Sequence, residues 1–327
     1  MLNLKNQIFT INSEKEFNEI ALEIFNYQYS NNLVYNEFCK HLNIIPKQIN
    51  KRELIPFLPI AFFKSHSIKT GTFHEEEIFL SSGTTGQTQS KHFVKDLSLY
   101  ENSYLKAFNH FYGNIADYCV LALLPSYLER KGSSLIYMTE DLIQKSNHPK
   151  SGFFLENHSE MINILKENVK KNQKTLLIGV SFALLDLAEA YRIDLNDVII
   201  METGGMKGRR KELTRTELHS IYKNSFNVSK IHSEYGMTEL LSQAYSKGDG
   251  IFETPPWMKI MIRDINDPFS TLEVNRTGGI NIIDLANIDS CSFIATQDLG
   301  KKSSATHFEV LGRFDNSDLR GCNLLIS

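Results

Sequence analysis

The stretch TLLIGVSFALLDLAEAY at residues 175–191, followed by DVIIM at residues 197–201, decides the fold. Residues 175–180 predict a strand, and Ser181 predicts the N-cap of a helix that runs to Tyr191. Residues 197–201 predict the next strand. This order is typical of a βαβ crossover, so we expect an α/β protein whose sheet is mainly parallel, with helices on its faces.

Further short apolar runs extend this pattern at residues 78–80, 118–124 and 230–231. In an open parallel sheet, ligands bind beyond the carboxyl ends of the strands. The residues that follow the five predicted strands are all polar or rich in glycine: Ser81–Thr84, Pro125–Ser126, Ser181, Thr203–Gly205 and Glu234–Gly236. We therefore expect a ligand site along this edge.

A chain of 327 residues is long for a single compact core, so we expect a main domain with smaller attachments. Residues 1–76 predict a helical N-terminal segment, which opens with the capping-box pattern Ser13-x-x-Glu16. Residues 77–245 predict an α/β nucleotide-binding core. Residues 246–310, punctuated by Pro and Gly, predict a small β-rich subdomain, and residues 311–327 a truncated hinge and tail.

The composition favours an ordinary globular enzyme. A hydrophobic content of 42 % and a net charge of −3 provide no long-range attraction to nucleic acid. No signal peptide and no apolar stretch of about 20 residues is visible, so we expect a cytoplasmic protein without a membrane span. The four cysteines form no C-x-x-C pair, and the histidines lack zinc-site spacing, which disfavours structural zinc and a disulfide framework.

Residues 80–91 read LSSGTTGQTQSK, a hydroxyl-rich loop with glycine hinges and a lysine behind it. Backbone N–H groups, hydroxyls and one cation can surround phosphate oxygens. The candidate phosphate-binding residues are Ser82, Gly83, Thr84, Thr85, Gly86 and Lys91. Gln87 stands where a Walker loop requires lysine, so an ordinary P-loop hydrolase is disfavoured. The alternative is a solvated turn.

A second motif, EYGMTE at residues 234–239, places an aromatic ring, a hydroxyl and a carboxylate close together. Tyr235 is suited to stacking on adenine, Thr238 to bonding the α-phosphate, and Glu239 to holding Mg²⁺, which prefers oxygen ligands. The alternative is a helix start capped by Thr238. Further on, TQDLG at residues 296–300 offers a carboxylate for ribose hydroxyls, and GRFD at residues 312–315 offers an arginine.

In chain order these motifs resemble TSGTTGxPK, YGxTE, TGD and GRxD of the adenylate-forming (AMP-forming) superfamily of acyl and aryl ligases. Residues 56–66, 202–209 and 233–245 resemble the LuxE-like acyl-protein synthetases within it, and the similarity covers nearly the whole chain. The resemblance implies the large N-terminal α/β domain of these enzymes.

It also implies a two-step reaction. ATP, with Mg²⁺, would activate a carboxylic acid, expected to be a fatty acid, as acyl-AMP, and a thiol of a protein, a carrier protein or coenzyme A would then take the acyl group. By resemblance, Tyr235, Gly236 and the Gly204-Gly205 turn would flank adenine. Asp298 and Arg313 would bind ribose.

Two departures from the superfamily pattern concern lysines. Residues 88–91 replace the usual Pro-Lys, so Lys91 matches only with a shift. The chain also stops twelve residues after Asp315, where larger members begin a mobile C-terminal domain that carries a lysine. With that domain expected to be absent, its lysine would be dispensable, supplied by a partner, or replaced by Lys91 or Lys207.

LuxE-like enzymes carry the acyl group on a cysteine near the C-terminus, and Cys322 matches that position. The resemblance therefore implies that Cys322 attacks the adenylate as thiolate, assisted by Arg320. A buried, unreactive cysteine is the alternative. For the whole protein, the alternatives are an acyl- or aryl-CoA or carrier-protein ligase, and a non-catalytic nucleotide-binding subunit.

Overall fold

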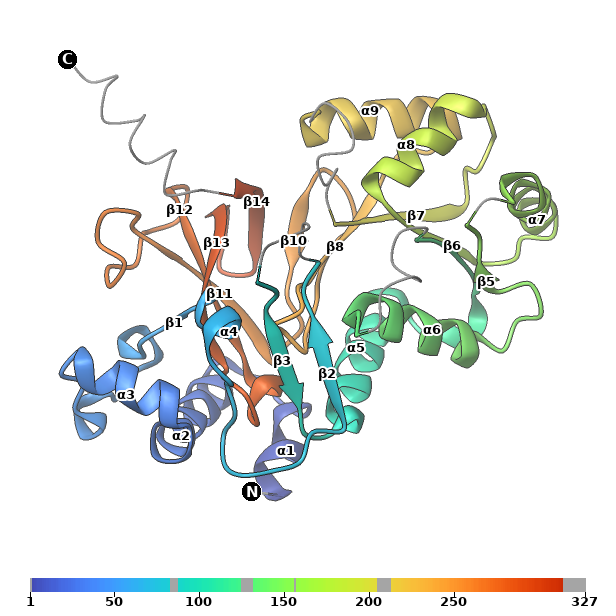
Figure 1. The fold of residues 1–327 in the computed structure, drawn as a ribbon. Helices are drawn as coiled ribbons and strands as arrows, with labels where there is room; N and C mark the ends of the chain where they lie inside the picture. The colour runs from blue at the N-terminus through green and yellow to red at the C-terminus, as the bar shows by residue number, and fades with distance from the viewer. Residues whose placement is uncertain (1, 83–87, 125–131, 156, 205–212, 314–327) are drawn as a thin grey trace, which may run out of the picture. The chain divides into compact units, whose positions relative to one another are not determined.

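The computed structural model describes residues 2–82, 88–124, 132–155, 157–204 and 213–313 (Figure 1). The chain divides into two compact units. The first comprises Met1–Ser103, Glu239–Ser242 and Glu253–Ser327, and the second comprises Tyr104–Thr238 and Gln243–Phe252. Residues 1–76 thus fall in the first unit, whereas residues 246–310 are divided between the two units after Phe252.

The helices of the first unit come mainly from its N-terminal part: α1 (Leu2–Ile8), α2 (Glu14–Asn31), α3 (Leu33–His41) and α4 (Phe62–Ser65). Ser13 caps α2 as predicted, because its hydroxyl accepts a hydrogen bond from the Glu16 N–H at 3.3 Å. The Glu16 carboxylate accepts from the N–H of Asn12 rather than of Ser13. Helix α5 (Leu97–Tyr112) begins in this unit and ends in the second.

The strands of the first unit form an antiparallel sheet in the order β11 (Met258–Arg263), β12 (Thr277–Asp284), β13 (Phe293–Lys302) and β14 (His307–Arg313). The two-residue strand β1 (Leu58–Pro59) runs parallel to β13, which agrees with the extended segment that two nearby prolines favour. Strand β2 (Glu77–Leu80) pairs antiparallel with β3 (Lys91–Val94) in a separate hairpin. The run at residues 78–80 therefore does not belong to the parallel sheet. The four residues of β2 pair with β3, the strand directly after the loop, and a local pattern does not distinguish this pairing from a place in the parallel sheet.

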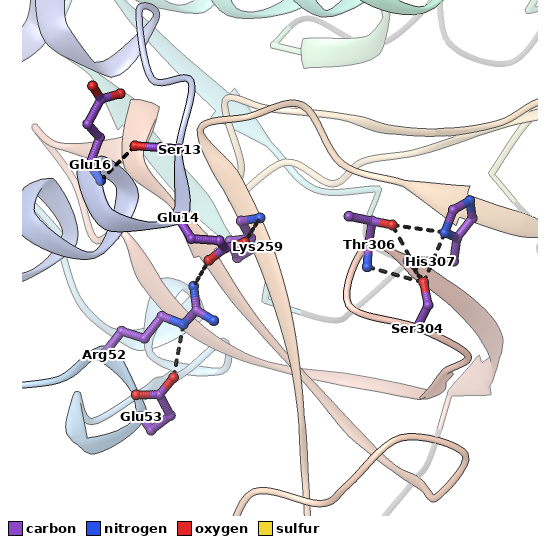
Figure 2. Close-up of polar contacts among 9 residues, drawn as sticks. All are labelled: Ser13, Glu14, Glu16, Arg52, Glu53, Lys259, Ser304, Thr306 and His307. Atoms are coloured by element: carbon purple, nitrogen blue, oxygen red, sulfur yellow. Dashed lines mark hydrogen bonds and ion pairs between the residues drawn. The ribbon is translucent and has the colours of Figure 1, made fainter.

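An exposed ionic network ties α2 to two other segments of the first unit. Figure 2 shows Glu14 between two cations, with Arg52 Nη1 and Lys259 Nζ each 2.6 Å from one of its carboxylate oxygens. Burial alone would raise the pKa of Glu14, but the hydrogen bonds from Lys259 and Arg52 outweigh it and lower the pKa below its ordinary value. Because Glu14 is more than half exposed, the network contributes little energy and chiefly orients the start of α2.

The second unit contains the predicted parallel sheet. Its strands follow the order β10 (Ile251–Glu253), β9 (Ala244–Ser246), β8 (His232–Tyr235), β7 (Val198–Thr203), β6 (Thr175–Val180), β4 (Cys119–Leu123) and β5 (Gly152–Phe153). The strands from β8 to β5 are parallel, and β9 pairs antiparallel with β8. Every residue of β4 and β6 is buried, as expected for strands covered on both faces.

The helices of the second unit follow the strands they connect: α6 (Ser134–Ser146), α7 (His158–Lys170), α8 (Ser181–Ala190) and α9 (Arg215–Phe226). In Figure 1, α8 and α9 lie on one side of this sheet and α6 on the other. The βαβ crossover at residues 175–203 is confirmed. Ser181 is the first residue of α8 and not its N-cap, since that position belongs to Val180.

Candidate functional site

The hydroxyl-rich loop begins and ends at two serines of the β2–β3 hairpin. The Ser81 N–H donates to the Ser90 carbonyl at 3.1 Å, and the Ser90 N–H donates to the Ser81 hydroxyl at 2.8 Å. The Gln89 side chain adds a donor to the Ser81 carbonyl at 2.7 Å. These bonds close the base of the loop and leave Ser82 and Thr88 exposed.

Ser90 connects this loop to the second motif, because its side chain is hydrogen-bonded to the Glu239 carboxylate. Both residues are buried, and Glu239 is 6 % exposed. Burial raises the pKa of the Glu239 carboxyl, while the Ser90 hydrogen bond and the charge of Arg313 act in the opposite direction without cancelling it. Ser90 and Glu239, which lie far apart in the chain, thus meet in the first unit.

The two predicted ribose-binding residues lie opposite each other in the same unit. Asp298 of β13 and Arg313 of β14 are direct register partners, and Nε of Arg313 is 3.5 Å from Oδ1 of Asp298. Asp298 is largely buried, whereas the Arg313 side chain is 72 % exposed. Cross-strand pairs of opposite charge stabilise a sheet only modestly. Both charges act on Glu239, so the first unit gathers Ser90, Glu239, Asp298 and Arg313.

In the second unit, the predicted polar residues do gather at the carboxyl ends of neighbouring parallel strands. Gly204 follows β7 with a φ of 69°, a conformation that favours glycine. Its carbonyl accepts a hydrogen bond from the Ser181 hydroxyl at 3.0 Å, and the Ser181 carbonyl accepts one from the Tyr222 hydroxyl at 2.6 Å. The ends of β6 and β7 are therefore joined to α9.

Glu234 and Tyr235 occupy the end of β8. The Thr203 hydroxyl donates to Oε2 of Glu234 at 2.5 Å, and burial raises the pKa of this carboxyl to about 7. A Cβ on Gly236 would lie 2.4 Å from Oε1 of Glu234, which explains the glycine. Tyr235 is half-buried, and its ring packs edge-on against Phe252 at 6.0 Å.

Lys91 and Thr238 are two further predicted site residues. Lys91 is exposed at the start of β3, and the adjacent Ser90, rather than Lys91, contacts Glu239. Thr238 is half-buried in the turn before Glu239. Several predicted residues lie outside the described ranges: Gly83, Thr84, Thr85, Gly86, Gly205, Lys207 and Cys322.

Sequence reasoning missed three residues that support Glu239. Ser90 lies within the predicted loop, directly before the candidate Lys91. Asp284 and Asn287 belong to no local motif, and both contact the segment 239–242. Local patterns do not identify them, because each contacts a backbone group more than 40 positions away.

The residues around Glu239 fit Mg²⁺. This ion is usually held by one or two carboxylates together with phosphate oxygens and waters. Glu239 supplies a buried carboxylate whose charge is disfavoured by burial, and a bound divalent cation would compensate that cost. Ser90 orients the carboxylate.

Two solved structures are similar to this chain in fold. MatB from Rhodopseudomonas palustris, bound to ATP, has 16 % identity and a TM-score of 0.54 over 72 % of this chain and 47 % of that one. The open conformation of 2-hydroxyisobutyryl-CoA ligase (HCL), in complex with 2-HIB-AMP and CoA, has 11 % identity and a TM-score of 0.65 over 94 % of this chain and 72 % of that one. The chain therefore shares the fold of these solved structures.

The chain spans about half the length of the MatB structure that it matches, at 47 %. The thioesterification state of HCL, also with 2-HIB-AMP and CoA, matches with a TM-score of 0.65 over 93 % of this chain and 69 % of that one. No family model matches the sequence, and no curated protein matches it. Across the part of the chain that the structure describes, no helix is both long and apolar enough to cross a membrane.

Proposed function

We propose that this protein activates a carboxylic acid with ATP as acyl-AMP and then transfers the acyl group to a thiol. The observation that carries the proposal is the hydrogen bond between Ser90 and Glu239, which joins the candidate phosphate loop to the candidate metal ligand. The Asp298–Arg313 pair beside Glu239 supports it. So does the fold shared with enzymes solved with ATP or an acyl adenylate.

In the first step, a carboxylate oxygen of the acid attacks the α-phosphorus of ATP, and the bond to the bridging oxygen breaks to release pyrophosphate. Both partners are anions, so donors and cations must offset their repulsion. The loop hydroxyls and backbone N–H groups of residues 82–86, with Thr238, would bind phosphate oxygens. Mg²⁺ held by Glu239 would offset phosphate charge when bound, and Tyr235 with the Gly204-Gly205 turn would hold adenine.

In the second step, a thiolate sulfur attacks the acyl carbon and AMP leaves. We propose a protein thiol as acceptor and a fatty acid as substrate, on the resemblance to LuxE-like acyl-protein synthetases, with Cys322 as the candidate carrier. The second candidate acceptor is coenzyme A, which is present in the HCL complexes.

Pyrophosphate exchange tests the first step. Labelled pyrophosphate should enter ATP only when a suitable acid is added, across a panel of short, long and aromatic carboxylic acids. Absence of exchange with every acid would refute the proposal and favour a non-catalytic nucleotide-binding subunit.

The acceptor is tested with labelled acid, ATP and the purified chain. A protein-bound label that hydroxylamine removes, and that is lost in Cys322→Ala but not in Cys119→Ala, is expected for transfer through Cys322. Cys119 is a matched control because it is buried inside β4. A label that survives Cys322→Ala would eliminate Cys322, and release of acyl-CoA on adding coenzyme A would identify the other acceptor.

A further inference from the structure

One corner of the first unit holds the segment that carries Glu239. This corner, residues 284–292, starts with Asp284 at the end of β12 and includes the short 3₁₀ turn η4 (Leu285–Asn287). Two of its side chains contact residues 239–242. Asn287 Nδ2 donates to the Glu239 carbonyl at 2.7 Å, and the Leu241 N–H donates to the Asp284 carboxylate at 2.9 Å.

Asp284 is fully buried and accepts hydrogen bonds from four donors. They are the N–H groups of Leu241, Ser242 and Ala286 and the Ser242 hydroxyl, at 2.6–3.2 Å. Burial raises the pKa of Asp284, and these four donors counteract the shift only in part. Burying a carboxylate costs desolvation free energy even when the group is fully hydrogen-bonded. The presence of Asp284 here therefore indicates that the backbone path of residues 241–242 matters.

Asn287 indicates more clearly that the backbone path of this segment matters. It is fully buried, and its Oδ1 has no hydrogen-bond partner among the described residues. Buried unsatisfied polar atoms are uncommon in folded proteins and call for an explanation. The amide Nδ2 of Asn287 donates to the carbonyl of Glu239. An apolar residue would avoid the unsatisfied oxygen but would lose this contact.

The corner itself is held by α2. Gln28 is fully buried, and its amide donates to the carbonyls of Asn287 and Ile288, each at 3.0 Å. Its carbonyl oxygen accepts from the Ser292 N–H at 2.9 Å. Helix α2, the corner and the Glu239 segment therefore form one continuous chain of buried hydrogen bonds.

We propose that Asn287 and Asp284 are positioning residues, which fix the backbone of residues 239–242 so that the Glu239 carboxylate is presented to Ser90 and to a divalent cation. This inference rests on the proposed function, in which Glu239 binds Mg²⁺. Neither residue touches the metal or the substrate; each acts on the main chain that carries Glu239. Second-layer partners of this kind usually change metal affinity or activity about 10- to 100-fold.

The test is Asn287→Leu, which removes the donor and the unsatisfied oxygen together while keeping a similar volume. We expect the Mg²⁺ concentration for half-maximal pyrophosphate exchange to rise about 10-fold or more. The affinity for Mn²⁺·ATP, measured by calorimetry, should fall by a similar factor, with the unfolding midpoint close to that of the wild type. Asp284→Asn, which faces the backbone N–H groups with an amide, is a second variant expected to shift metal affinity in the same direction.

The matched control is Ser290→Ala, in the same corner. Ser290 is equally buried, but its hydroxyl donates to the Ile68 carbonyl and not to residues 239–242. This variant should keep the wild-type metal dependence. Folded Asn287→Leu and Asp284→Asn proteins with wild-type metal dependence would overturn the inference.

The two proposals can fail separately. If the wild type binds Mn²⁺·ATP but exchanges no pyrophosphate, the proposed function fails and the binding data still decide the role of Asn287. If the wild type does not bind Mn²⁺·ATP, the inference fails as well.

Discussion

Replacing Glu239 with glutamine separates its chemical role from its structural one. The side chain is 6 % exposed, and the substitution keeps its shape and its ability to accept the Ser90 hydrogen bond. It removes the charge that would hold a divalent cation. Loss of one such electrostatic contact to a reacting phosphate typically costs about 3–4 kcal/mol, or roughly 10²–10³ in rate. We expect acid-dependent pyrophosphate exchange to fall by about that factor.

The stability of the Glu239→Gln protein should rise, whereas its exchange activity should fall. Burial raises the pKa of Glu239 above its ordinary 4.5, so the folded state disfavours the charged form. The carboxyl therefore contributes most to stability below pH 4.5, and this contribution is lost as the pH rises through the raised, folded-state pKa. At pH 8 the glutamine variant should be at least as stable as the wild type towards urea, and its advantage should shrink as the pH falls.

The control is Glu309→Gln, which removes a partly exposed carboxylate of the same unit that pairs with Lys301 at 3.1 Å. It should leave exchange unchanged. Wild-type exchange in a folded Glu239→Gln protein would refute the metal role. Loss of exchange together with unfolding would refute the claim that the charge is dispensable for the fold.

Two further predictions concern the second unit. Burial raises the pKa of Glu234 from 4.5 to about 7. Glu234→Gln should therefore gain stability relative to the wild type as the pH rises from 4.5 to 7, by about 3 kcal/mol at most. Urea unfolding at pH 5 and pH 8 measures this gain, and a stability difference that does not depend on pH would contradict it. In Gly236→Ala the new Cβ would lie 2.4 Å from Glu234 Oε1 and force that flexible side chain away from Thr203, at a cost of about 1 kcal/mol. A Gly236→Ala protein as stable as the wild type would show that Glu234 does not need its observed position.

The apolar periodicity of the sequence predicts the parallel strands of the second unit, but it does not predict the pairing of β2 with β3 in the hairpin. Continuous apolar runs such as residues 175–180 identify strands covered on both faces, and the intervening helical pattern requires a parallel crossover. The run at residues 78–80 looks the same locally, but β2 pairs with β3 and not with the parallel sheet. Strand partners are chosen by contacts that a short apolar run does not encode.

The sequence by itself determined the chemical groups that are available: a hydroxyl-rich loop, a carboxylate after an aromatic residue, and an aspartate and an arginine near the end of the chain. The order and spacing of these groups along the chain indicated their chemical roles. Only the tertiary structure decided which neighbour contacts Glu239, because the side chain of Ser90 is hydrogen-bonded to its carboxylate.

The tertiary structure also decided what supports the site. Asp284 and Asn287 hold residues 239–242 through main-chain hydrogen bonds. Every residue has the same backbone N–H and C=O groups, apart from the missing N–H of proline, so such a contact leaves no signature in the sequence of the segment that is held. It arises only when the folded chain brings the corner at residues 284–292 against Glu239.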